Sequence, residues 1–200
     1  MITFNLPTTL TLIRLVLSPI ILPILFVYLL PLNNVVINGL LGLLFVAFSL
    51  TDFFDGYLAR KYRQETALGS ILDPIADKFL VYSVLIALAV VHKMYFFWVI
   101  IFIGREFFMM GLRQIALEHH FSVHVSMLGK LKTAFQMICL TVIIANPYQS
   151  LGFGLHGKEL FNTIELITLT LALLFTVASG YLYYRSFITQ FTNIQSGKDL

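Results

Sequence analysis

Six long apolar stretches separated by short polar segments constrain this chain more than any other feature of its sequence. Crossing a bilayer core of ~30 Å takes roughly 20 helical residues, and each stretch comes close to that length. The stretches cover about residues 8–30, 35–55, 74–91, 95–115, 127–146 and 163–184. We therefore predict an all-α integral membrane protein with six transmembrane helices, forming a single domain over residues 1–200.

Composition agrees with this fold class. The chain is 58% hydrophobic and only 12% charged, unlike the usual composition of a soluble domain. The first stretch has no basic n-region or small-residue cleavage site, and Arg14, Pro19 and Pro23 interrupt it, so we expect a retained helix rather than a signal peptide. Cys139 is the only cysteine, which excludes a disulfide within the chain and a thiolate metal cluster.

The basic residues predict the orientation of the chain in the membrane. With the N-terminus inside, the inner segments hold most of them, at Arg60, Lys61, Arg63, Lys130, Lys132, Arg185 and Lys198, whereas the outer turns hold Lys93 and Lys158. Outer turns are expected at 31–34, near 92–93 and at 146–162, and polar inner connections at 56–72 and 116–130. We therefore expect cytoplasmic termini and a polar active-site cavity facing the cytoplasm.

Five of the ten acidic residues lie in the 26 residues from Asp52 to Asp77, and four of the five are aspartates. Asp52 and Asp55 are three apart at the end of one expected span, and Asp73 and Asp77 are four apart at the start of the next, so each pair shares a helix face. A carboxylate at membrane depth costs ~2.5–3.5 kcal/mol on insertion scales, and neighbouring carboxylates repel each other.

A divalent cation offsets both costs, because Mg²⁺ binds through carboxylates and substrate phosphates. Two ions ~3.5–4 Å apart would clamp the attacking and leaving oxygens of an in-line displacement at phosphorus. We predict that the four aspartates hold Mg²⁺ (or Mn²⁺), as two ions per active site.

The alternative is that each aspartate caps a helix or pairs with Arg60, Lys61, Arg63 or Lys78. Asp73 before Pro74 has the sequence of a cap followed by a favoured first-turn proline. The small residues between the two pairs favour a ligand site instead, because a ligand can approach the backbone closely there. These are Gly56, Ala59 and Gly69, and the planar side chain of Arg60 is suited to binding a phosphate.

Together these positions read D-x-x-D-G-x-x-A-R, eight residues, then G-x-x-x-D-x-x-x-D. The pattern resembles the signature of the CDP-alcohol phosphatidyltransferases at all eight positions, and six spans also resemble that family. The resemblance implies that Asp52, Asp55 and Asp73 bind metal and diphosphate, and that Asp77 is a further ligand or the general base. It also implies a homodimer, with Gly56, Ala59 and Gly69 lining the cytidine pocket and Arg60 nearby.

Basic residues in the second half of the chain point to the acceptor. Arg105 and Glu106 lie within an apolar run, where a charge marks a functional site by default. Arg113 lies about two turns further on, roughly on the same face, and Lys130 and Lys132 begin the next span. Such cations suit a phosphomonoester. The alternative is that Arg105 pairs with Glu106 structurally, and that the lysines follow the positive-inside rule or reach lipid headgroups.

A narrower resemblance, to bacterial phosphatidylglycerophosphate synthases, rests on NLPTTLTLIRLVLSPI, on the GRE around Arg105 and on GKLKT at 129–133. It implies phospholipid biosynthesis in the bacterial cytoplasmic membrane, by phosphatidyl transfer from CDP-diacylglycerol to sn-glycerol 3-phosphate, giving phosphatidylglycerophosphate and CMP. Asn5 and Thr8 would then lie on the CDP-lipid side. Membrane lipids are the other expected partners, and no nucleic acid is expected.

Other readings stay open on the sequence alone. Cardiolipin synthases share the aspartates but use phosphatidylglycerol as the acceptor, and other relatives use inositol phosphate. A divalent-cation transporter could use the same carboxylates, although the basic residues expected on the same face would repel a travelling cation. A noncatalytic membrane scaffold would need none of the aspartates.

Overall fold

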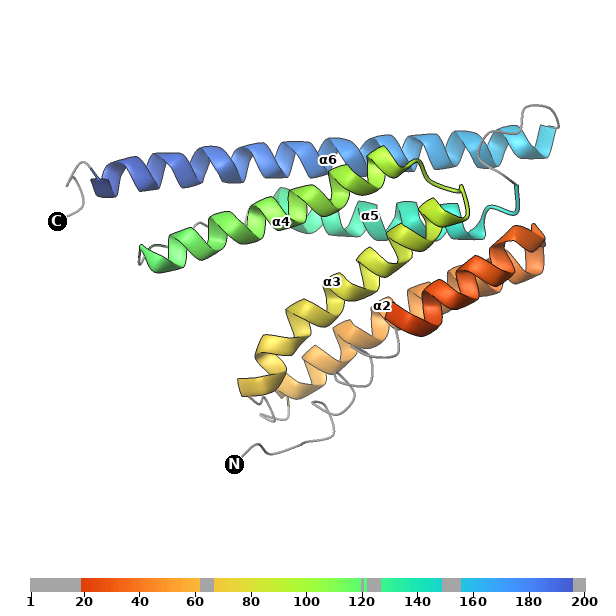
Figure 1. Cartoon of the computed structure of the whole chain (residues 1–200), viewed down its shortest axis with the longest axis horizontal. Coiled ribbons are helices and arrows are strands. Elements are labelled where there is room, and N and C mark those ends of the chain that lie inside the picture. The colour runs from red at the N-terminus through yellow and green to blue at the C-terminus, as the bar shows by residue number, and fades with distance from the viewer. Residues whose placement is uncertain (1–18, 62–66, 120, 122–126, 149–155, 196–200) are drawn as a thin grey trace. The chain divides into compact units, whose positions relative to one another are not determined.

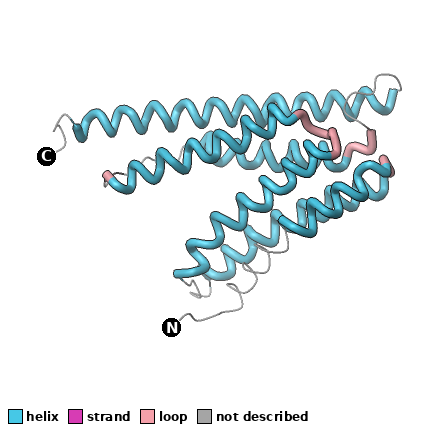
Figure 2. The backbone as a smooth tube through the Cα atoms, viewed as in Figure 1, coloured by secondary structure: helices cyan, strands magenta, loops and turns pink. Residues whose placement is uncertain are grey.

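The computed structural model describes residues 19–61, 67–119, 121, 127–148 and 156–195 (Figure 1). The side chains of residues 51–61, 67–74, 76–77, 156–158 and 195 are not among the features described. Within these ranges the backbone is helical and contains no strand, as predicted (Figure 2). Helical residues 19–29 and the 3-10 helix η1 (Leu30–Leu32) precede α2 (Val35–Lys61), α3 (Ala67–Val90), α4 (Phe96–Glu118), α5 (Met127–Ala145) and α6 (His156–Gln195).

The distribution of side chains differs from that in a soluble protein. Large apolar residues are exposed along the helices, among them Leu43 at 67%, Phe97 at 62% and Leu166 at 65%. Polar residues are buried instead, including Asn38, Lys93, Lys132, Gln136, Asn146, Glu165, Thr176 and Ser179. Continuous exposed apolar surface of this kind fits contact with lipid.

Two described helices are long and apolar enough to cross a membrane, Met127–Ala145 and Glu159–Ile194. Shorter apolar helices occupy Pro19–Leu32, Val35–Leu50 and Lys78–Val90. The expectation of six spans therefore stays a prediction, while the all-helical architecture is confirmed.

The chain divides into two compact units. The first comprises residues 1–96 and 140–159, and the second comprises residues 97–139 and 160–200. In the first unit, α2 and α3 are in contact. The Cβ of an alanine at Gly42 would lie 3.4 Å from the Ala145 Cβ, so the absence of a side chain at Gly42 allows α2 to lie close to the end of α5.

A buried polar network joins three helix ends in this unit. The carbonyl oxygen of Asn146 accepts a hydrogen bond of 2.9 Å from Asn38 Nδ2 and another from the ammonium group of Lys93. The start of α2, the turn after α3 and the end of α5 therefore meet at one level. Asn34 caps α2, because its Oδ1 accepts bonds of 2.9 Å and 3.2 Å from the amides of Val36 and Ile37.

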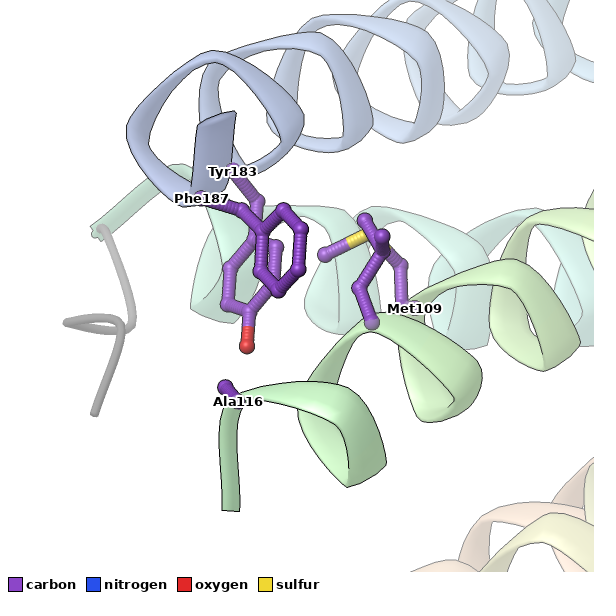
Figure 3. Close-up of a cluster of buried hydrophobic side chains, with 5 residues drawn as sticks. Met109, Ala116, Tyr183 and Phe187 are labelled. Atoms are coloured by element: carbon purple, nitrogen blue, oxygen red, sulfur yellow. The ribbon is translucent and has the colours of Figure 1, made fainter. Parts of the chain in front are cut away.

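In the second unit, α4 and α6 pack through a cluster that includes Met109, Ala116, Tyr183 and Phe187 (Figure 3). Phe121 and Phe191 pack against this cluster, and the rings of Phe187 and Phe191 are stacked at 5.7 Å. The cluster fixes the register of α4 against α6 beside the polar residues that follow.

Several predicted boundaries were wrong. α2 continues to Lys61 and α3 begins at Ala67, so most of the expected inner connection 56–72 is helical. Likewise, α6 begins at His156 within the expected outer connection 146–162, and it ends at Gln195 rather than near 184. Helices extend past their apolar stretches because backbone hydrogen bonding does not require an apolar side chain. Glu159 in the first turn of α6 also favours helix there, by interacting with the helix dipole.

Candidate active site

The aspartate motif lies on two consecutive helices that are in contact. Asp52 and Asp55 belong to α2, and Asp73 and Asp77 belong to α3. Asp55 is six residues before the end of α2, and Asp73 is six residues after the start of α3. At a rise of ~1.5 Å per residue, Asp55 lies about 9 Å from the C-terminal end of α2, and Asp73 lies about 9 Å from the N-terminal end of α3. The two halves of the motif are thus at matching depth.

The capping alternative for Asp73 is wrong. α3 begins at Ala67, so Asp73 lies inside the helix and Pro74 is not a first-turn proline. Because proline has no amide hydrogen, Pro74 donates nothing to the carbonyl of Ser70, four residues earlier. An interior proline therefore leaves a backbone acceptor near the Asp73 position. The structure thus excludes helix capping, an explanation of Asp73 that needed no ligand.

Of the four predicted acceptor-site cations, Arg105 and Lys132 are brought together by Glu106. Nη1 of Arg105 donates to Glu106 Oε1 at 2.7 Å, and Nζ of Lys132 donates to the same oxygen at 2.6 Å. The side chain of Lys132 is only 6% exposed, and those of Arg105 and Glu106 are 16% and 17% exposed. At this burial the charges are screened far less than at a surface. The Arg105–Glu106 pairing weighed as an alternative is present, and Lys132 shares in it.

A second contact fixes the other end of the guanidinium. Nη2 of Arg105 donates to Ser179 Oγ on α6 at 2.9 Å. Nε of Arg105 is buried and has no hydrogen-bond partner in the part of the chain that the structure describes. A Cβ at Gly180 would lie 3.6 Å from Arg105 Cγ. The Arg105 side chain is therefore held along its length by α6.

The remaining predicted acceptor residues form no ion pair with this cluster. Arg113 on α4 and Lys130 on α5 are exposed, and neither forms an ion pair with another described residue. Gly56, Ala59 and Arg60 lie on α2 and Gly69 lies on α3, each as a backbone position. Asn5 and Thr8 fall outside the described residues.

Sequence reasoning missed Ser179 and gave Glu106 no role in a site. Glu106 was noted as a charge in an apolar run, but only as a structural partner of Arg105. Ser179 carried only a weak signal, a serine beside Gly180 in a long apolar helix. Such a residue usually bonds its own helix, and Ser179 Oγ does donate to the Thr176 carbonyl at 3.2 Å.

Comparison with known proteins identifies the family of the chain. The family described as CDP-alcohol phosphatidyltransferase matches residues 4–178. The chain belongs to this family.

Relatives in three bacteria agree. The chain is 38% identical over 187 residues to a CDP-diacylglycerol–glycerol-3-phosphate 3-phosphatidyltransferase of Rickettsia typhi, covering 94% of this chain and 99% of the relative. Proteins with the same name in Bacillus subtilis and Escherichia coli K12 are 35% and 36% identical. These matches cover 90% and 83% of this chain, and 94% and 90% of the relatives.

Membership makes this chain a transferase of the membrane, and its motif carboxylates have the chemistry that the family's divalent metal needs. Carboxylate oxygens are the hard donors that Mg²⁺ prefers, and the four aspartates of the motif lie on two helices that are in contact. Among the side chains that the structure describes, no group of three or more His, Cys, Asp or Glu residues could hold a metal ion. The described side chains thus offer no competing site, and the motif aspartates remain the predicted ligands.

Proposed function

We propose that this chain transfers the phosphatidyl group of CDP-diacylglycerol to sn-glycerol 3-phosphate, releasing CMP and forming phosphatidylglycerophosphate. The observation that carries this proposal is the complete eight-position motif on α2 and α3 in a chain that matches glycerol-3-phosphate phosphatidyltransferases over almost its whole length. The Arg105–Glu106–Lys132 cluster supports the choice of acceptor, because buried cations suit a phosphomonoester.

In this proposal the chain is one functional domain of six spans in the bacterial cytoplasmic membrane, with both termini in the cytoplasm. Asp52, Asp55, Asp73 and Asp77 hold two divalent cations, Mg²⁺ or Mn²⁺, whose charge neutralises the diphosphate of the donor. The CDP-lipid pocket comprises Gly56, Ala59, Arg60 and Gly69, with Asn5 and Thr8 from the N-terminal segment. The protein acts as a homodimer with a polar cavity open to the cytoplasm.

The proposed reaction is one displacement at phosphorus. Asp77 accepts the proton of the acceptor hydroxyl. The deprotonated oxygen then uses a lone pair to form a bond to the lipid-side phosphorus. The bond from that phosphorus to the bridging oxygen breaks, and CMP leaves with the electron pair. Arg105 and Lys132 hold the phosphate of the acceptor, and Arg113 and Lys130 are assigned to the approach to this site.

The test offers the purified protein CDP-diacylglycerol together with labelled glycerol 3-phosphate, serine, inositol phosphate or phosphatidylglycerol. Label entering lipid from glycerol 3-phosphate alone is the expected result. Label from any other acceptor would overturn the acceptor assignment. Divalent-cation flux into liposomes without release of CMP would support a transporter and overturn the proposal as a whole.

A further inference from the structure

One oxygen atom of Glu106 lies between two cations that come from different helices. Oε1 accepts from Arg105 on α4 at 2.7 Å and from Lys132 on α5 at 2.6 Å. Two cations held this close to one point repel each other strongly where water is scarce. The carboxylate is what allows them to stay there, so Glu106 sets the separation between the ammonium and the guanidinium.

Glu106 and Ser179 together fix the direction of the guanidinium. Nη1 is bonded to Glu106 and Nη2 to Ser179, while Nε is buried without a partner in the described part of the chain. A guanidinium held at two of its nitrogens keeps one orientation. The bonds of the guanidinium join α4 to α6, and the bond from Lys132 to Glu106 joins α5 to the same cluster.

One carboxylate carries a single negative charge, whereas the two side chains that share it carry two positive charges. Glu106 therefore reduces the mutual repulsion of Arg105 and Lys132 without cancelling their attraction for a dianion. Charges that are already in position bind a ligand more tightly, because the side chains lose little conformational entropy on binding.

We propose that Glu106 is a positioning residue for the acceptor. It holds Arg105 and Lys132 at the spacing that binds a phosphomonoester dianion, with Ser179 as the second support. This inference rests on the proposed function, because the acceptor that brings the phosphate is glycerol 3-phosphate.

The experiment measures initial rates with purified wild-type protein and Glu106→Gln, varying glycerol 3-phosphate and CDP-diacylglycerol separately. Glutamine keeps the shape and one acceptor oxygen, so the substitution removes chiefly the charge. Glu118→Gln is the matched control, since Glu118 lies on the same helix, is exposed, and accepts a hydrogen bond of 3.3 Å from Gln114.

For Glu106→Gln we expect the KM for glycerol 3-phosphate to rise about tenfold or more, as loss of a charge-assisted hydrogen bond implies. The KM for CDP-diacylglycerol and the kcat should stay close to those of the wild type. The inhibition constant of inorganic phosphate, competing with glycerol 3-phosphate, should rise in parallel. Glu118→Gln should match the wild type in all four quantities.

An unchanged KM for glycerol 3-phosphate in an active Glu106→Gln protein would overturn the inference and leave a purely structural ion pair. A lowered KM would also overturn it, because Glu106 would then compete with the phosphate. If Glu106→Gln does not fold, Glu106→Asp keeps the charge but draws the carboxylate back, and the same rise in KM is required. A wild-type protein that puts no glycerol 3-phosphate into lipid would instead refute the proposed function itself.

Discussion

Nη2 of Arg105 donates a 2.9 Å hydrogen bond to the hydroxyl of Ser179, which lies 74 residues later in the chain. Together with the bond from Nη1 to Glu106, this bond determines where the guanidinium points. The apolar cluster next to it supports the bond from both helices, because Met109 is one turn after Arg105 and Tyr183 is one turn after Ser179.

Ser179→Ala should weaken acceptor binding without removing it. We expect a roughly threefold to tenfold rise in the KM for glycerol 3-phosphate, because a single hydrogen bond contributes ~0.5–1.5 kcal/mol. Steady-state kinetics with CDP-diacylglycerol at saturation provide the measurement. Gly180→Ala is the neighbouring control, since its Cβ would make only ordinary van der Waals contact with Arg105. Equal effects of the two substitutions would contradict a specific role for the hydroxyl.

Asp77→Asn should lower kcat by at least ~100-fold, because a positioned general base contributes about that much or more. Label transfer from glycerol 3-phosphate to lipid measures the loss. The folded state should persist, which size-exclusion profiles in detergent can verify. Full activity in Asp77→Asn would exclude Asp77 as base and as an essential ligand.

Removal of divalent cations with a chelator should abolish transfer, because the charge of the diphosphate and of four nearby carboxylates would lose its counterions. Activity should return with Mg²⁺ or Mn²⁺ and not with Na⁺ or K⁺. The readout is CMP release at constant ionic strength. Undiminished release after chelation would refute the metal assignment for the four aspartates.

Gly42 and Gly39 offer a matched pair for testing the packing of α2. Gly42→Leu should reduce thermal stability markedly, because even a Cβ there lies 3.4 Å from Ala145. Gly39→Leu should be neutral or slightly stabilising, because nothing lies within 4 Å of its Cβ and leucine favours helix over glycine. The midpoint of thermal unfolding in detergent distinguishes the two variants, and equal midpoints would show that the α2–α5 approach is loose.

Lys93→Met should lower stability by ~1 kcal/mol and leave transfer activity nearly unchanged. The ammonium donor is lost, but the Asn146 carbonyl keeps the bond from Asn38. Val90→Met, at an exposed position near the same end of α3, is the control. A loss of activity larger than the loss of folded protein would show that Lys93 does more than join helix ends.

The apolar pattern predicted a helix end correctly where the apolar stretch and the helix end at nearly the same residue. The predicted 127–146 span ends one residue after α5 does, and the predicted 95–115 span begins one residue before α4 does. The apolar pattern failed where a helix continues beyond its apolar stretch, as at Lys61 and Ala67, because hydropathy does not detect a polar helical turn. The aspartate motif could be recognised from local spacing, and its role as a metal site stays a prediction. Ser179 could not be recognised in this way, because no spacing rule connects α4 to a residue 74 positions away.

The Asn38–Lys93–Asn146 network also imposes an order on biosynthesis. A chain made from its N-terminus exposes Asn38 first and Lys93 next, whereas Asn146 follows 108 residues after Asn38 and 53 after Lys93. Until the end of α5 has been synthesised, the amide of Asn38 and the ammonium group of Lys93 lack this acceptor. The first unit is therefore complete only once residues 140–159 have joined it.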